Sequence, residues 1–84
     1  MPVAIDAQVG LLDKLLSRLA HIPQSEESEI AQEHFQEARV YLLGAAYDEY
    51  AFSLGLGRRA IHAMRDRNTR SELDHLVSQV ISSR

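Results

Sequence analysis

The chain has 84 residues, a formal net charge of −3 and no cysteine. This length predicts a single domain, residues 1–84, and the missing thiols exclude disulfides, thiol catalysis and thiolate metal sites. No stretch without charged side chains approaches the roughly 20 residues of a bilayer-spanning helix. The first residues lack the basic and apolar segments of a signal peptide. We therefore expect a cytoplasmic protein that does not associate with membranes.

The first predicted helix covers residues 6–21. Asp6 can cap its start, and Pro23 ends it, because proline pushes the preceding residue out of the helical conformation. One apolar stripe at helical spacing identifies the buried face. This stripe contains Ile5, Val9, Leu12, Leu16 and Leu19, with Leu15 beside them.

The second predicted helix runs from residue 26 to residue 65. Ser25 is a good N-cap, and acidic residues follow it in the first turn, where the helix dipole favours them. No proline interrupts the segment, but Gly44, Gly55 and Gly57 weaken it. The predicted fold is all-α. It is a small helical bundle of three helices with a long central helix, or of four helices if the central helix breaks near Gly55.

The third predicted helix covers residues 70–82. Thr69-Arg70-Ser71-Glu72 matches a capping box, in which the threonine caps forward and the glutamate reaches back. Its apolar face contains Leu73, Leu76, Val77, Val80 and Ile81. No strand-like alternation of apolar and polar residues occurs, so no sheet is expected.

The long central helix suggests a second copy of the chain. Unbroken, it would measure about 60 Å at 1.5 Å per residue, roughly twice the diameter expected for a compact chain of this size. Its apolar residues lie on two sides, which is typical of a helix buried between neighbours. Between them runs a stripe of mostly small residues, which allow another backbone to approach closely. This stripe contains Gly44, Asp48, Ala51, Gly55 and His62.

The charge distribution suggests how two copies would pair. Residues 26–37 contain five glutamates and no lysine or arginine, whereas residues 58–70 contain five arginines and one acid. Two antiparallel copies crossing near Asp48 would set each acidic end against the other's basic end. The alternative is that both blocks are solvated faces, because exposed ion pairs contribute little. The interface predicted for the homodimer consists of Gly44, Tyr47, Asp48, Ala51, Phe52, Gly55, Glu33, Glu37, Arg58 and Arg59.

Two sequence features could support chemistry. Glu49 lies within an apolar stripe and is expected to be buried, where a carboxylate needs an arginine or tyrosine partner; the alternative is an acid or base with a raised pKa. Glu72 and His75 have the Glu-x-x-His spacing of di-iron bundles, but a second such motif is missing. No catalytic residue, metal ligand or cofactor is predicted.

The function favoured by these patterns is a non-enzymatic helical protein–protein interaction module, such as a regulator, adaptor or assembly factor. We expect it to be a homodimer that binds a larger protein. A first alternative is a nucleic-acid-binding regulator that contacts phosphates through the arginines of Arg58–Arg70. A second is a metal-binding or catalytic bundle that uses Glu49, Glu72 and His75.

Overall fold

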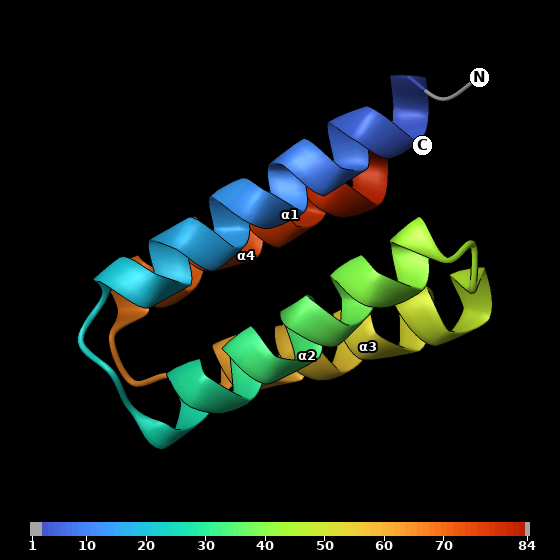
Figure 1. The fold of residues 1–84 in the computed structure, drawn as a ribbon. Helices are drawn as coiled ribbons and strands as arrows, with labels where there is room; N and C mark the ends of the chain where they lie inside the picture. Colours follow the sequence, from blue (N-terminus) through green and yellow to red (C-terminus); the bar gives the residue numbers. More distant parts are fainter. Residues whose placement is uncertain (1–2, 84) are drawn as a thin grey trace.

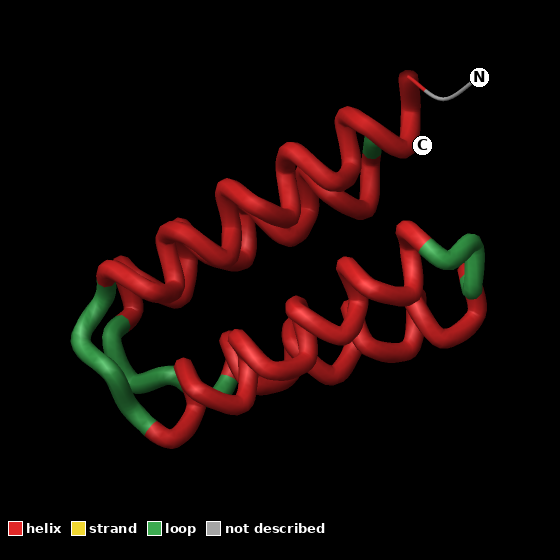
Figure 2. Tube along the Cα trace, in the orientation of Figure 1, coloured by secondary structure: helices red, strands yellow, loops and turns green. Residues whose placement is uncertain are grey.

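The computed structural model describes residues 3–83 and folds them into four helices without a strand (Figure 1). Consecutive helices are antiparallel, and short links join them (Figure 2). The bundle measures 38 × 18 × 17 Å. The predicted all-α bundle is therefore confirmed, in its four-helix form. The helices are α1 (Val3–His21), α2 (Glu26–Leu43), α3 (Tyr47–His62) and α4 (Arg67–Ser82).

The helices form two antiparallel pairs. Figure 1 shows α1 beside α4 and α2 beside α3. The pairs are joined because α1 also packs on α2, and α3 on α4. The α1–α2 and α3–α4 links lie at one end of the bundle, whereas the α2–α3 link lies at the other end, with the two ends of the described chain. We call this second end the open end.

A single apolar core lies between the four helices. Its largest fully buried side chain is Phe35. The buried face of α1 carries Leu12, Leu15 and Leu19 at helical spacing. The remaining fully or almost fully buried apolar residues of the core are Ala31, Ala38, Leu42, Ile61, Leu73, Val77 and Val80.

Small side chains bring α2 and α3 together, and these two helices make the most extensive contact in the bundle. The buried faces of both helices include serine, alanine or glycine at successive turns, namely Ser28, Ala31, Ala38, Ser53, Gly57 and Ala60. At Gly57 the ring of Phe35 rests on the α3 backbone, because a Cβ atom there would lie 2.6 Å from Phe35 Cζ. Close approach through small residues therefore occurs within one chain.

The expected continuous helix from 26 to 65 is wrong. The chain turns back at residues 44–46, and α3 then runs without interruption through Gly55 and Gly57 to His62. The alternative of four helices has the right number of elements, but its expected break near Gly55 is eleven residues too late. Phe35 explains why Gly57 is glycine: the residue makes room for a ring and does not end a helix.

The turn between α2 and α3 is a Schellman motif. The Ala45 N–H donates to the Leu42 carbonyl (3.1 Å), and the Ala46 N–H donates to the Tyr41 carbonyl (2.8 Å). The motif needs one left-handed residue, which is usually glycine. Here it is Ala45, with φ 59°, whereas Gly44 has an ordinary φ of −89°. Gly44 lies one residue before the left-handed position, so its place in the sequence does not indicate this turn.

Replacing Ala45 by glycine is expected to raise the free energy of unfolding by about 0.5–1 kcal/mol. The left-handed conformation costs an alanine roughly 1–2 kcal/mol, and the larger backbone entropy of glycine in the unfolded chain offsets part of the gain. Urea denaturation followed by circular dichroism measures the difference. Ala46→Gly is the control and is expected to destabilise, since Ala46 has φ −91°. A stability loss in Ala45→Gly would contradict the assignment of this turn.

The helix starts match the predictions in part. Ser25 caps α2 as predicted: its Oγ accepts from the Ser28 N–H (3.2 Å), and its own N–H donates to Ser28 Oγ (2.8 Å). The first helix begins at Val3, so Asp6 lies in its first turn and is not the cap. Asp66 caps the last helix by accepting from the Asn68 N–H (3.2 Å), which replaces the predicted cap at Thr69.

Candidate functional site

The outward side of α3 carries four residues at spacings of four, three and four, which places them on one helix face. All four are exposed, and they belong to the interface predicted from the sequence. Phe52 is 70% exposed although it is aromatic and lies in the middle of a helix. We call this set, Asp48, Phe52, Gly55 and Arg59, the outer stripe of α3.

A groove of about 400 Å³ lies beside the outer stripe, between α2 and α3. Phe52 forms one wall and Tyr41 the other. The carboxylates of Glu37, Asp48 and Glu49 also line it, and none of its described lining residues is a lysine or an arginine. The groove is therefore a shallow acidic surface with an aromatic edge.

The expected burial of Glu49 is wrong, because its side chain is exposed on this groove. On a continuous helix, helical spacing would place Phe35, Leu42 and Phe52 on the apolar stripe that contains Glu49. The turn at residues 44–46 separates them, so that Phe35 and Leu42 point into the core while Phe52 points outward. Residues before and after the turn no longer share a helix face, and Glu49 follows Phe52 to the surface.

The other predicted interface residues are dispersed. Gly44 is exposed within the link, and Glu33 and Glu37 are exposed on α2. Tyr47 and Ala51 line a cavity between the helix pairs. The predicted crossing requires a continuous helix over residues 26–65, and the chain does not form one. Since α2 and α3 are antiparallel, the acidic block of α2 lies at the same end as the arginines of α3 in the same chain.

Arg58, the last predicted interface residue, is engaged in a polar cluster between α3 and α4. Asp74 Oδ1 accepts hydrogen bonds from His62 Nε2 (2.8 Å) and Arg58 Nε (3.1 Å). The hydrogen bond from His62, with a further one from Arg58, holds the pKa of the Asp74 carboxyl below its ordinary value although the group is partly buried. Sequence patterns do not indicate this cluster, because its members lie on two different helices.

Stability is expected to fall in acid, in part through Asp74. Its folded-state pKa lies below the unfolded value of about 3.9. The stabilisation is therefore complete above the unfolded pKa and is lost as the pH falls through the folded pKa. Asp74→Asn should cost up to about 1 kcal/mol near neutral pH, since the pair is partly exposed, and should flatten the acid limb. Denaturant titrations at several pH values measure both effects. An acid limb as steep as that of the wild type would contradict this role.

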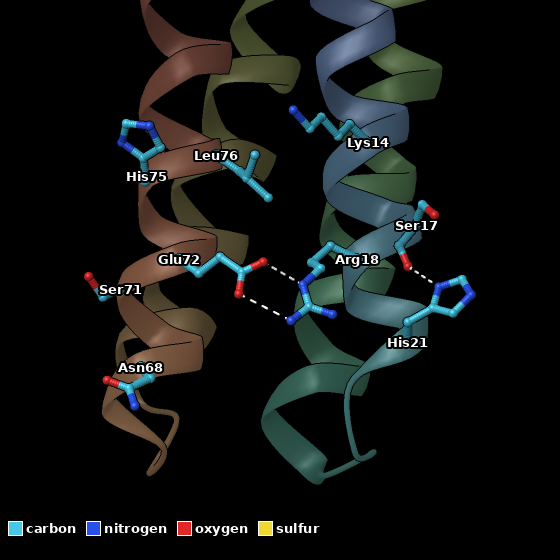
Figure 3. A pocket seen from close by; sticks show the side chains of 9 residues that line it. All are labelled: Lys14, Ser17, Arg18, His21, Asn68, Ser71, Glu72, His75 and Leu76. Carbon is cyan, nitrogen blue, oxygen red and sulfur yellow. Dashed lines mark hydrogen bonds and ion pairs between the residues drawn. The ribbon is translucent and has the colours of Figure 1, made fainter.

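A second polar surface lies between α1 and α4, where a groove of about 1040 Å³ is open to solvent (Figure 3). Arg18 and Glu72 bridge it through paired hydrogen bonds, which hold the pKa of Glu72 below its ordinary value. Glu72 therefore binds Arg18 and does not reach back to Thr69. Figure 3 shows His75 one turn along α4, pointing away from this ion pair. Both partners are exposed, so the bridge contributes little to stability.

The described residues do not assemble a metal site, and part of the arginine block is bound within the chain. Within residues 3–83, no group of three or more histidine, aspartate or glutamate side chains is positioned to hold a metal ion. In the arginine block, Arg58 is bound to Asp74, and Arg70 donates to the Met64 carbonyl (3.1 Å). Across the same described segment, no helix has the length and apolar content needed to cross a membrane.

No protein-family model, curated protein or solved structure matches the chain. The outer stripe of α3 and its exposed phenylalanine are therefore the features on which a function can be argued.

Proposed function

We propose that the chain is a non-enzymatic helical interaction module that acts as a homodimer through the outer stripe of α3. The observation that carries this proposal is Phe52, exposed over 70% of its surface at the centre of an outward helix face. Burying such a ring is worth about 1.5–3 kcal/mol, and aromatic residues are enriched at interfaces. The bundle already buries its core without Phe52, so its exposed ring suits contact with another molecule.

The outer stripe is self-complementary. If two α3 helices pack antiparallel about a point midway between Phe52 and Gly55, each Phe52 faces the partner's Gly55. The same midpoint sets each Asp48 against the partner's Arg59. Both contacts are then made twice by one twofold axis, as a closed dimer requires. Gly55 has space for a ring, since nothing lies within 4 Å of the position a Cβ would take.

The aromatic contacts and the ion pairs contribute differently to the proposed dimer. The two rings supply most of the affinity, because each loses apolar surface to its partner. Exposed ion pairs contribute only a few tenths of a kcal/mol each, so Asp48 and Arg59 select the antiparallel orientation. A dimer held by one helix from each copy is expected to be of modest affinity.

Apolar surface outside the outer stripe supports binding to a larger protein. Val40, Leu43 and Tyr47 are each more than half exposed and lie near the α2–α3 link. Val40 follows Glu37 by three residues, so it extends the edge of the groove that Phe52 lines. Contiguous apolar patches on small proteins commonly mark interaction sites. The proposed role is therefore that of a dimeric regulator, adaptor or assembly factor.

A charge swap tests the homodimer. In sedimentation equilibrium, the wild-type mass should rise with concentration from the 9.5 kDa of one chain to twice that value. Asp48→Arg and Arg59→Asp should each weaken the dimer about tenfold, since two ion pairs become repulsive, and the double variant should recover it. Phe52→Ser should remove it.

Lys14→Glu is the matched control, because it makes the same charge change as Arg59→Asp on an exposed face of α1. Its dimer affinity should equal that of the wild type. The proposal fails if the wild type is monomeric at all concentrations, if the charge-swapped double variant stays dissociated, or if Phe52→Ser dimerises normally.

A further inference from the structure

A cavity of about 620 Å³ lies at the open end of the bundle, between the α1–α4 pair and α3. Its walls come from residues far apart in the sequence: Ile5 of α1, Leu54 of α3 and Ile81 of α4. Two tyrosines of α3, Tyr47 and Tyr50, add aromatic surface. This volume and this mostly apolar lining fall within the range of small-molecule sites.

Gln8 is the unusual member of this lining. It occupies the buried face of α1, four residues before Leu12, and only 9% of its surface is exposed. Its amide makes no side-chain hydrogen bond with any residue in the described part of the chain, whereas the buried Ser28 is bonded to Ser25. Gln8 lines the cavity, and its amide is not among the described side-chain groups that are closed off from solvent without a partner. The amide can therefore donate a hydrogen bond to a ligand in the cavity, or accept one from it.

The lining also indicates the charge of such a ligand. Among the described residues that line the cavity there is no lysine, arginine or histidine, and the one carboxylate among them, that of Asp48, is exposed. A ligand carboxylate or phosphate would lose its hydration without gaining a cation, and it would be repelled by Asp48. The tyrosines favour an aromatic ring, which stacks on or packs edge-to-face with other rings.

We infer that the cavity at the open end binds a neutral aromatic molecule that carries one hydrogen-bonding group, with Gln8 as the residue that binds this group. This inference does not rest on the homodimer: Asp48 belongs to both surfaces, but Phe52, Gly55 and Arg59 of the outer stripe do not line the cavity.

Fluorescence titration with N-phenyl-1-naphthylamine tests the site, since this probe is neutral, aromatic and has a single N–H. We expect saturable binding of one probe per chain. Ala51→Phe fills the cavity from its exposed wall and should weaken binding at least tenfold. Ala20→Phe is the matched control, because it adds the same ring to an exposed position of α1 away from the cavity, and it should bind as the wild type does.

A second binding measurement tests whether Gln8 bonds the polar group of the ligand. Gln8→Leu should weaken binding of the amine about three- to tenfold, as loss of one hydrogen bond implies. It should leave unchanged the binding of 1-benzylnaphthalene, in which a methylene replaces the N–H; that binding is measured by competition. Circular dichroism checks that each variant is folded.

Several outcomes would overturn the inference. These are the absence of saturable binding, full affinity in Ala51→Phe, and loss of binding in Phe52→Ser, which would move the probe to the outer stripe. An affinity that falls as the protein dimerises would show that a second copy, and not a small molecule, covers the cavity.

Discussion

Phe35→Ala is expected to lower the free energy of unfolding by about 3–5 kcal/mol, the range for removing a fully buried aromatic ring. The side chain has no exposed surface and lies between α2 and the backbone of α3. Because Gly57 faces the ring, the α3 side of the space that the substitution leaves has no side chain at that position to fill it. Equilibrium denaturation with guanidinium chloride measures the loss.

Phe52→Ala makes the same chemical change on the surface. Under conditions where the chain is monomeric, it should change stability by less than about 0.5 kcal/mol, as is usual for exposed positions. Similar losses in the two variants would mean that Phe35 does not hold the centre of the core.

Gly57→Ala is expected to destabilise the protein by about 1–3 kcal/mol, although alanine is the better helix former by about 1 kcal/mol. The new Cβ would lie 2.6 Å from Phe35 Cζ, a distance at which the buried ring must move. Gly10→Ala is the control. Gly10 is also inside a helix, but nothing lies within 4 Å of its Cβ position, so this variant should gain about 0.5–1 kcal/mol. Thermal and urea denaturation of both variants provide the comparison.

A double-mutant cycle identifies the cause. In a Phe35→Leu background the ring is absent, so Gly57→Ala should become neutral or stabilising, with a coupling energy of about 1–3 kcal/mol between the two positions. Equal losses in both backgrounds would show that the glycine is needed for some other reason than the contact with Phe35.

Sequence patterns correctly predicted the helix features that depend on residues close together in the chain. Ser25 caps α2 through bonds to the next turn, and Leu73, Val77 and Val80 are buried at helical spacing. Phe52 and Gly55 of the predicted interface are exposed on α3, and the interface itself stays a prediction. These features involve residues at most a few positions apart, which periodicity can detect.

Features that depend on tertiary contacts were not predictable in the same way. The turn at residues 44–46 places Ala45 in a left-handed conformation that glycine favours. The pattern instead predicts a break near Gly55, because Gly55 and Gly57 weaken the helix. Gln8 did give a signal, because it has the same spacing from Leu12, Leu15 and Leu19 as a core residue. Its polarity placed it outside the apolar stripe, and only the packed helices reveal the cavity that it lines.

The left-handed alanine in the α2–α3 link gives the chain a competing topology. If residues 44–46 became right-handed helix, the conformational cost at Ala45 would disappear, and α3 with α4 would swing away from α1 with α2. Two such opened molecules can rebuild every core contact by exchanging halves, which is domain swapping. Short links under strain favour this exchange. The left-handed conformation of Ala45 is therefore a cost that the closed bundle carries and that a swapped pair with a helical link would not carry.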